Sequence, residues 1–113
     1  MDEANIEFSS EPTDPQIDTS DSRVIRMRTF SKAHGMAGAR IGYIIGHKEL
    51  ITGINKIRLH FAVNRIAQVG ALASLDDPEH VAYFVNEVDR GRKYYYNLAT
   101  SLNLSYIPSA ANS

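Results

Sequence analysis

The stretch "RTFSKAHGMAGARIGY", residues 28–43, places Lys32 between two apolar runs. In the run before it, residues 24–30, apolar and polar side chains alternate, which predicts a β-strand. The run after it, residues 41–45, is short and apolar and predicts a buried strand. The loop between them contains glycines, which relax the limits on backbone conformation. The pattern therefore predicts a strand, a glycine loop and a second strand, with Lys32 at the end of the first strand.

Two further strands and one loop are expected outside this stretch. Residues 4–8 are partly alternating and predict the end of a strand, and residues 104–107 predict another that Pro108 ends. Residues 9–22 are rich in Ser, Asp, Thr and Pro and predict a surface loop.

The second half of the chain has the apolar periodicity of helices. Apolar residues recur every three or four positions over residues 50–57, and residues 63–75 form an alanine-rich run that predicts a buried helix. Asp77 and Pro78 are typical of the N-cap and first turn of a helix, and the apolar face continues to Leu102. Strands followed by helices predict an α/β fold.

Composition limits the classes of function. The 113 residues suit one small domain, and a hydrophobic fraction of 43% favours a globular protein. The net charge of −1 gives no positive electrostatic field that would attract nucleic acid. The acidic, polar start lacks the pattern of a secretory signal, and no apolar run reaches the length of a membrane span. We therefore expect a cytoplasmic location, with neither nucleic acid nor membrane as a partner.

Metal and aromatic sites are not expected. The chain has no cysteine, and its four histidines are scattered without the spacing of a helical metal pair. Three consecutive tyrosines, residues 94–96, point in different directions on a helix, so we expect them to pack rather than to stack on a ligand.

The residues around Lys32 have the chemistry to bind a phosphorylated aldehyde. A lysine held at a strand end becomes nucleophilic when its pKa is lowered, whereas an isolated lysine is usually a solvated surface residue. Thr29 and Ser31 add hydroxyls, and Arg40 carries a planar guanidinium that suits an oxyanion such as phosphate. Together these groups suggest pyridoxal phosphate bound as an imine.

The segment SKAHGMAGARIGY resembles the lysine signature of the class I/II pyridoxal-phosphate-dependent aminotransferases. With DEANIEF upstream and KIRLHFAVNRIAQVGALASLDD downstream, the chain is most similar to the histidinol-phosphate aminotransferase-like branch. This resemblance implies part of the large domain of the fold-type-I transferase fold. It also implies amino-group transfer between an amino acid, or histidinol phosphate, and a 2-oxo acid.

The resemblance assigns roles to individual residues. Lys32 matches the catalytic lysine that binds the cofactor and moves the proton, and Thr29, Ser31 and Arg40 match phosphate ligands. Asp2 matches the aspartate that pairs with the pyridine nitrogen, where a carboxylate keeps the ring electron-poor.

Asn5 occupies a cofactor-binding position at which the related proteins usually carry a tyrosine. The resemblance further implies that residues 1–103 belong to the large domain and residues 104–113 begin the small domain. Family members are several times longer, and the upstream phosphate loop and the substrate-binding arginine are expected outside these residues. A homodimer is expected of the full-length protein.

Three hypotheses follow. The chain is a fragment of an aminotransferase, weak or inactive alone; or a non-catalytic remnant that keeps cofactor or phosphate binding; or a partial sheet that associates through its open edges. A visible absorbance band from a lysine-bound cofactor favours the first hypothesis, and its absence favours the second. A measurement of particle size in solution detects the association that the third predicts.

Overall fold

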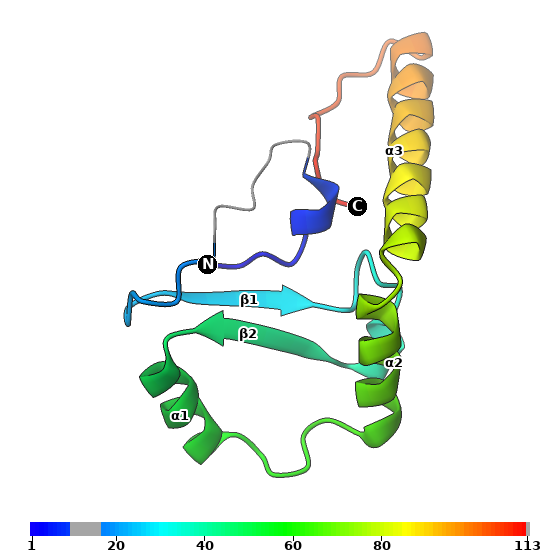
Figure 1. Cartoon of the computed structure of the whole chain (residues 1–113). Coiled ribbons are helices and arrows are strands. Elements are labelled where there is room, and N and C mark those ends of the chain that lie inside the picture. The colour runs from blue at the N-terminus through cyan, green and yellow to red at the C-terminus, as the bar shows by residue number, and fades with distance from the viewer. Residues whose placement is uncertain (10–16, 113) are drawn as a thin grey trace.

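The computed structural model describes residues 1–9 and 17–112, so part of the loop predicted at residues 9–22 lies outside the described residues. The described residues form two strands, three α-helices and two short 3-10 helices, η1 and η2. Figure 1 shows how the strands and the α-helices are arranged. Their bounds are η1 Ile6–Phe8, β1 Ile25–Thr29, η2 Ala37–Ala39, β2 Gly42–Gly46, α1 Lys48–Ile57, α2 Arg65–Leu75 and α3 Pro78–Ser101. Both strands predicted around the glycine loop are therefore confirmed.

The sheet consists of β1 and β2 in antiparallel register, with Thr29 opposite Gly42. The close approach of the strands requires glycine at position 42, because a Cβ there would lie 2.7 Å from the carbonyl oxygen of Arg28. The first residues of the chain add a short parallel edge on the other side of β1. Asp2 forms a bridge with Met27, and the Glu3 N–H donates to the Met27 carbonyl at 2.9 Å.

The strand predicted at residues 4–8 is wrong, because the strand-like pairing is at Asp2 and the chain turns away after Glu3. The Asp2 carboxylate accepts a hydrogen bond from the Ala4 N–H at 3.0 Å, a local turn that bends the backbone off the edge. Residues Ile6–Phe8 then form η1. A polar residue near the chain start therefore ends the pairing earlier than the alternating pattern indicates.

Side-chain caps fix where the helices begin. Asn64 Oδ1 accepts from the Ala67 N–H at 2.8 Å at the start of α2, and Asp77 accepts from the His80 N–H at 3.0 Å at the start of α3. Pro78 occupies the first turn of α3, so the predicted helix start is confirmed. His47 caps α1 by accepting from the Glu49 N–H.

The core lies between the sheet and one side of α2. Phe30 and Ile41 pack against Ala67 and Ala71, with Met36, Ala39, Tyr43 and Val63 around them. The prediction of a buried α2 holds for the two alanines only, since its large apolar side chains, such as Leu72 at 64%, are exposed. The prediction of a buried second strand is also wrong in part, because most of β2 is half-buried and Gly42 is exposed.

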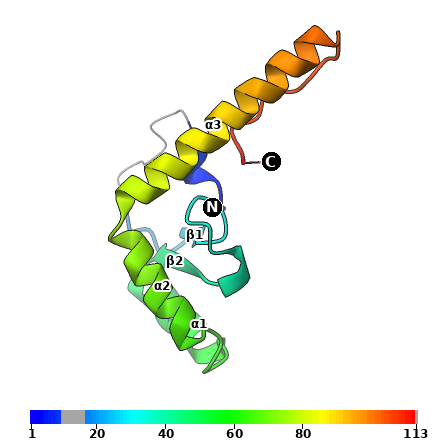
Figure 2. The ribbon, with the colours of Figure 1, turned by 90° about the vertical axis from the view of Figure 1, so that its right-hand side faces the viewer.

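The helix α3 continues beyond the sheet, and the C-terminal residues run back beside it (Figure 2). The strand predicted at 104–107 is wrong: no strand is present there, and Tyr106 instead stacks on Tyr96 with 4.4 Å between ring centroids. Packing is confirmed for Tyr96, whereas Tyr94 and Tyr95 are exposed. No helix in the described part of the chain combines the length and apolar character needed to span a bilayer.

Candidate functional site

Lys32 lies in a tight turn directly after β1. The Gly35 N–H donates to the Lys32 carbonyl at 2.9 Å, and the Met36 N–H donates to the Phe30 carbonyl at 2.8 Å. Gly35 has a φ of 68°, which favours glycine, and Ala33 is completely buried. The backbone of the lysine is thus held on both sides while its side chain stays half-buried.

The hydroxyls of Thr29 and Ser31 flank this turn. Thr29 Oγ1 accepts a hydrogen bond from the Ser31 N–H at 3.1 Å, which leaves the Thr29 O–H free to act as a donor toward another group. Both side chains are half-buried. The predicted phosphate ligands from this segment therefore lie one residue and three residues before Lys32 on a defined backbone.

Arg40 lies at the other end of the glycine loop, where η2 ends in a left-handed residue with a φ of 54°. The Phe30 N–H donates to the Ile41 carbonyl at 3.2 Å, which extends the antiparallel register by one residue and places Arg40 next to the residue paired with Phe30. The Arg40 guanidinium donates to the Ala37 carbonyl at 2.9 Å and is otherwise exposed. Arg40 therefore lies near the C-terminal end of β1, the end that leads into the Lys32 turn.

Asp2 shares a sheet face with Thr29. Residues paired across a sheet point to the same face, and successive residues point to opposite faces. Since Asp2 pairs with Met27, its side chain lies on the face of Met27 and Thr29. The Asp2 residue is exposed.

Glu3 points to the opposite face, where it binds two arginines. Its carboxylate accepts from Arg26 Nη1 and from Arg28 Nε, each at 2.9 Å, and its side chain is only 7% exposed. Donation of a hydrogen bond to the Glu3 carboxylate raises the pKa of Arg28, and a second hydrogen bond, to the Tyr43 hydroxyl, adds to this. This ion cluster holds the segment that carries Asp2 against β1.

The Glu3 cluster was not predicted from the sequence. The alternation of Arg26 and Arg28 with apolar residues did place both arginines on one face of a strand. Their acidic partner lies more than twenty residues earlier in the chain, at a distance that no periodicity within β1 reveals.

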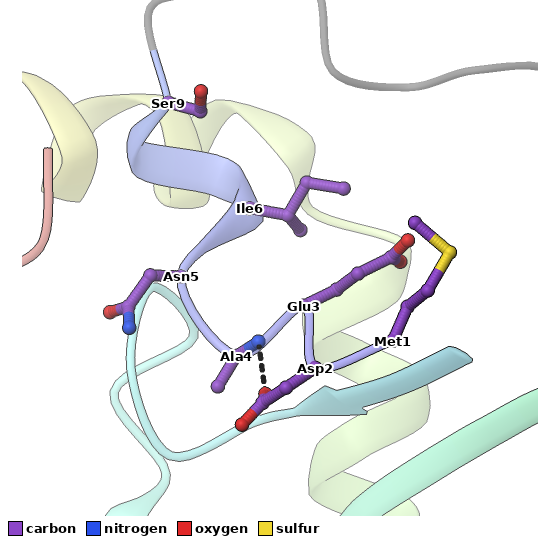
Figure 3. A pocket seen from close by; sticks show the side chains of 7 residues that line it. All are labelled: Met1, Asp2, Glu3, Ala4, Asn5, Ile6 and Ser9. Carbon is purple, nitrogen blue, oxygen red and sulfur yellow. Dashed lines mark hydrogen bonds between the residues drawn. The ribbon is translucent and has the colours of Figure 1, made fainter. Parts of the chain in front are cut away.

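A hollow of about 470 Å³ lies at the N-terminal segment and is lined by Met1, Asp2, Glu3, Ala4, Asn5, Ile6 and Ser9 (Figure 3). Asn5 Oδ1 is buried and has no hydrogen-bond partner among the described residues. The structure therefore brings Asp2 and Asn5 to one hollow, whereas Lys32, Thr29, Ser31 and Arg40 are not among its lining residues and gather at the end of β1.

These groups fit pyridoxal phosphate in chemical type. The amine of Lys32 suits the aldehyde of the cofactor, and the hydroxyls and the guanidinium suit its phosphate. The Asp2 carboxylate suits the ring nitrogen. Asn5 Oδ1 is a buried polar atom that forms no hydrogen bond with the described residues. Within residues 1–9 and 17–112, no group of three His, Asp or Glu side chains is placed to hold a metal ion.

Comparison with known proteins decides the family. The model of the class I and II aminotransferases matches residues 1–112. The chain belongs to the class I and II aminotransferases. The predicted resemblance and fold class are thus confirmed.

Several aminotransferases are similar to this chain. Histidinol-phosphate aminotransferase 2 of Carboxydothermus hydrogenoformans is 49% identical over 86 residues, which cover 76% of this chain and 24% of that protein. The histidinol-phosphate aminotransferase of Akkermansia muciniphila is 39% identical over 99% of this chain and 31% of its own length.

A solved structure is also similar, that of the Sinorhizobium meliloti histidinol-phosphate aminotransferase in complex with pyridoxal-5'-phosphate. It has a TM-score of 0.91 and 36% identity, and the match covers 97% of this chain and 30% of that one. The chain thus spans about a quarter to a third of the length of the relatives it matches.

Proposed function

We propose that this chain carries the lysine segment of a pyridoxal-phosphate-dependent aminotransferase. The reaction is amino-group transfer between an amino acid, or histidinol phosphate, and a 2-oxo acid. Family membership and the names of the relatives support this reaction class. The observation that carries the proposal is the fixed turn that holds Lys32 after β1, with Thr29 and Ser31 beside it and Arg40 returned to the same strand end.

Each residue has a role in this proposal. When bound, the cofactor supplies an electron sink for the substrate Cα–H bond. Lys32 Nζ would hold the cofactor by condensing with its aldehyde carbon with loss of water. Once the amine of the substrate has displaced it, the free Lys32 amine would accept and return the proton of the substrate Cα. Thr29 Oγ1, Ser31 Oγ and the Arg40 guanidinium bind the phosphate oxygens by donating hydrogen bonds to them.

Asp2 and Asn5 act on the ring. The Asp2 carboxylate accepts from the protonated ring nitrogen and stabilises its positive charge. The Asn5 amide, which is shorter than a tyrosine side chain and does not ionise, contributes a neutral hydrogen bond at the position where relatives use a phenol. The large-domain and small-domain division at residue 104, the homodimer and the cytoplasmic location stay predictions.

A cofactor titration tests the role of Lys32. We expect pyridoxal phosphate to produce a visible absorbance band with the 113-residue chain, and borohydride to convert the adduct to a stable one. Lys32→Ala should remove the band. Lys56→Ala, which changes an exposed lysine of α1, is the matched control and should keep it. A band of equal intensity in the Lys32→Ala variant would contradict the proposal.

Turnover by this chain alone is expected to be weak or absent, as proposed from the sequence. The catalytic geometry of the cofactor depends on contacts that hold the substrate Cα–H bond perpendicular to the ring. This chain spans at most a third of the length of its relatives, so it can bind the cofactor without catalysing the transfer. A transamination assay with amino acid and 2-oxo acid measures the second, and family-like rates would contradict this part of the proposal.

A further inference from the structure

His34 belongs to the turn that holds Lys32, and its side chain is buried. It is the third residue of the turn that the Gly35 N–H closes on the Lys32 carbonyl. Its side chain is 8% exposed, and its ring packs on Phe30 with 4.8 Å between centroids. The histidines at positions 60 and 80 are exposed, so the burial of His34 needs its own explanation.

Both ring nitrogens of His34 face polar groups on other elements. Nδ1 lies 2.7 Å from Ser74 Oγ of α2, which is a hydrogen-bond distance. Nε2 lies 3.9 Å from Glu7 Oε1 of η1, which is longer than a hydrogen bond. The ring therefore connects the lysine turn to α2 directly and faces η1 on its other side.

The hydroxyl of Ser74 both donates and accepts hydrogen bonds, so it can pair with His34 Nδ1 in either tautomer of the ring. The contact between the lysine turn and α2 therefore does not depend on which ring nitrogen carries the proton.

We propose that His34 is a positioning residue for Lys32. By binding Ser74, it fixes the turn against α2 and so fixes the direction in which the Lys32 side chain leaves the backbone. The role of Lys32 toward the cofactor rests on the proposed function, whereas the His34 contacts stand independently of it. Loss of the Ser74 contact should release the turn and change the surroundings of Lys32 Nζ.

The test measures the acetylation rate of each lysine by mass spectrometry, without cofactor. His34→Phe keeps a ring on Phe30 but loses both nitrogens, and His34→Asn restores a polar group near the place of Nδ1. We expect the Phe variant to change the Lys32 rate by roughly fivefold, the factor that about 1 kcal/mol of one hydrogen bond represents, and the Asn variant to restore it in part. The rates of exposed Lys48 and Lys56 should stay constant, as should all rates in the control His60→Phe.

Ser74→Ala removes the partner of His34 Nδ1 and so tests the same contact. It tests the positioning role even if His34→Phe does not fold. We expect it to change the Lys32 rate in the same direction, and the double variant to add little, because both changes break one contact. Ser101→Ala, at the end of α3, is its control.

An unchanged Lys32 rate in Ser74→Ala, or in a folded His34→Phe, would overturn the positioning role. The outcome is separable from that of the proposed function. Failure of pyridoxal phosphate to attach to Lys32, with the acetylation effects present, would count against the proposed function alone.

Discussion

The turn around Lys32 and the helices that follow it differ in how much of their apolar surface this chain buries. Phe30, Ala33 and Ile41 are at most 9% exposed, and they surround a turn closed by backbone hydrogen bonds. Along the helices, by contrast, Ile66 is 86% exposed and Leu98 is 41% exposed. Residues of this chain thus stabilise the lysine turn, whereas the helices present apolar faces that residues 1–9 and 17–112 do not cover.

The overall dimensions agree with this contrast. The radius of gyration is 17.1 Å, whereas about 13 Å is typical of a compact domain of this length. Figure 1 shows the cause: α3 extends away from the sheet rather than across it. Substitutions should therefore have large effects near the turn and small effects along the outer helix faces.

The largest effect is expected for Phe30→Ala. Phe30 is 3% exposed and contacts the rings of His34 and Tyr43 as well as α2, so its loss leaves a cavity in the small core. We expect a loss of about 3–5 kcal/mol of unfolding free energy, measured by urea denaturation. Phe61→Ala is the matched control, because Phe61 is 95% exposed and should change stability little. Equal losses for the two variants would remove the contrast.

Glu3→Gln is expected to cost about 3 kcal/mol of unfolding free energy, because it removes the carboxylate that pairs with the buried Arg26 and the half-buried Arg28. Urea denaturation measures this loss as well. Glu87→Gln removes an exposed carboxylate that pairs with Arg90 and should cost less than about 1 kcal/mol. If Glu3→Gln has an equally small effect, the ion cluster does not hold the N-terminal segment on β1.

A buried and an exposed residue of α2 give an intermediate test. Ala71→Leu adds volume at a buried position and should cost about 1–3 kcal/mol of unfolding free energy. Leu72→Ala changes the adjacent, exposed residue and should change the free energy of unfolding by less than about 0.5 kcal/mol. A larger loss for Leu72→Ala would show that another surface covers this side of the helix.

The smallest effect concerns Asp89 on α3. The hydrogen bond from Lys93 Nζ lowers the pKa of Asp89, and Arg92 adds to this. A lowered pKa in the folded state gives stability that is present above the ordinary value of an aspartate and is lost as the pH falls through the folded value. Lys93→Met should raise the Asp89 pKa in an NMR titration, with little change in stability because the pair is exposed. An unchanged titration would show that the pair is not formed in solution.

Local patterns in the sequence predicted the elements that local rules control. The alternation of residues 24–30, the apolar run at 41–45 and the Asp77 cap all correspond to observed elements. The lysine signature identified the family, which the matching family model confirms. The roles of individual site residues stay predictions.

Contacts distant in sequence explain where local patterns failed. Residues 104–107 have strand-like composition, but Tyr106 finds a stacking partner on α3 instead of a neighbouring strand. The Glu3 ion cluster and the His34 contact to Ser74 each join residues more than twenty positions apart. Periodicity within one segment carries no information about such partners.

Peptide mapping of the borohydride-reduced adduct tests the central claim most directly. The chain has four lysines, so each can be compared with the others in one digest. We predict that pyridoxyl label accumulates on the peptide that contains Lys32 at cofactor concentrations that leave Lys48, Lys56 and Lys93 largely unmodified. Label spread evenly over the four lysines would contradict the claim that this turn presents a lysine to the cofactor.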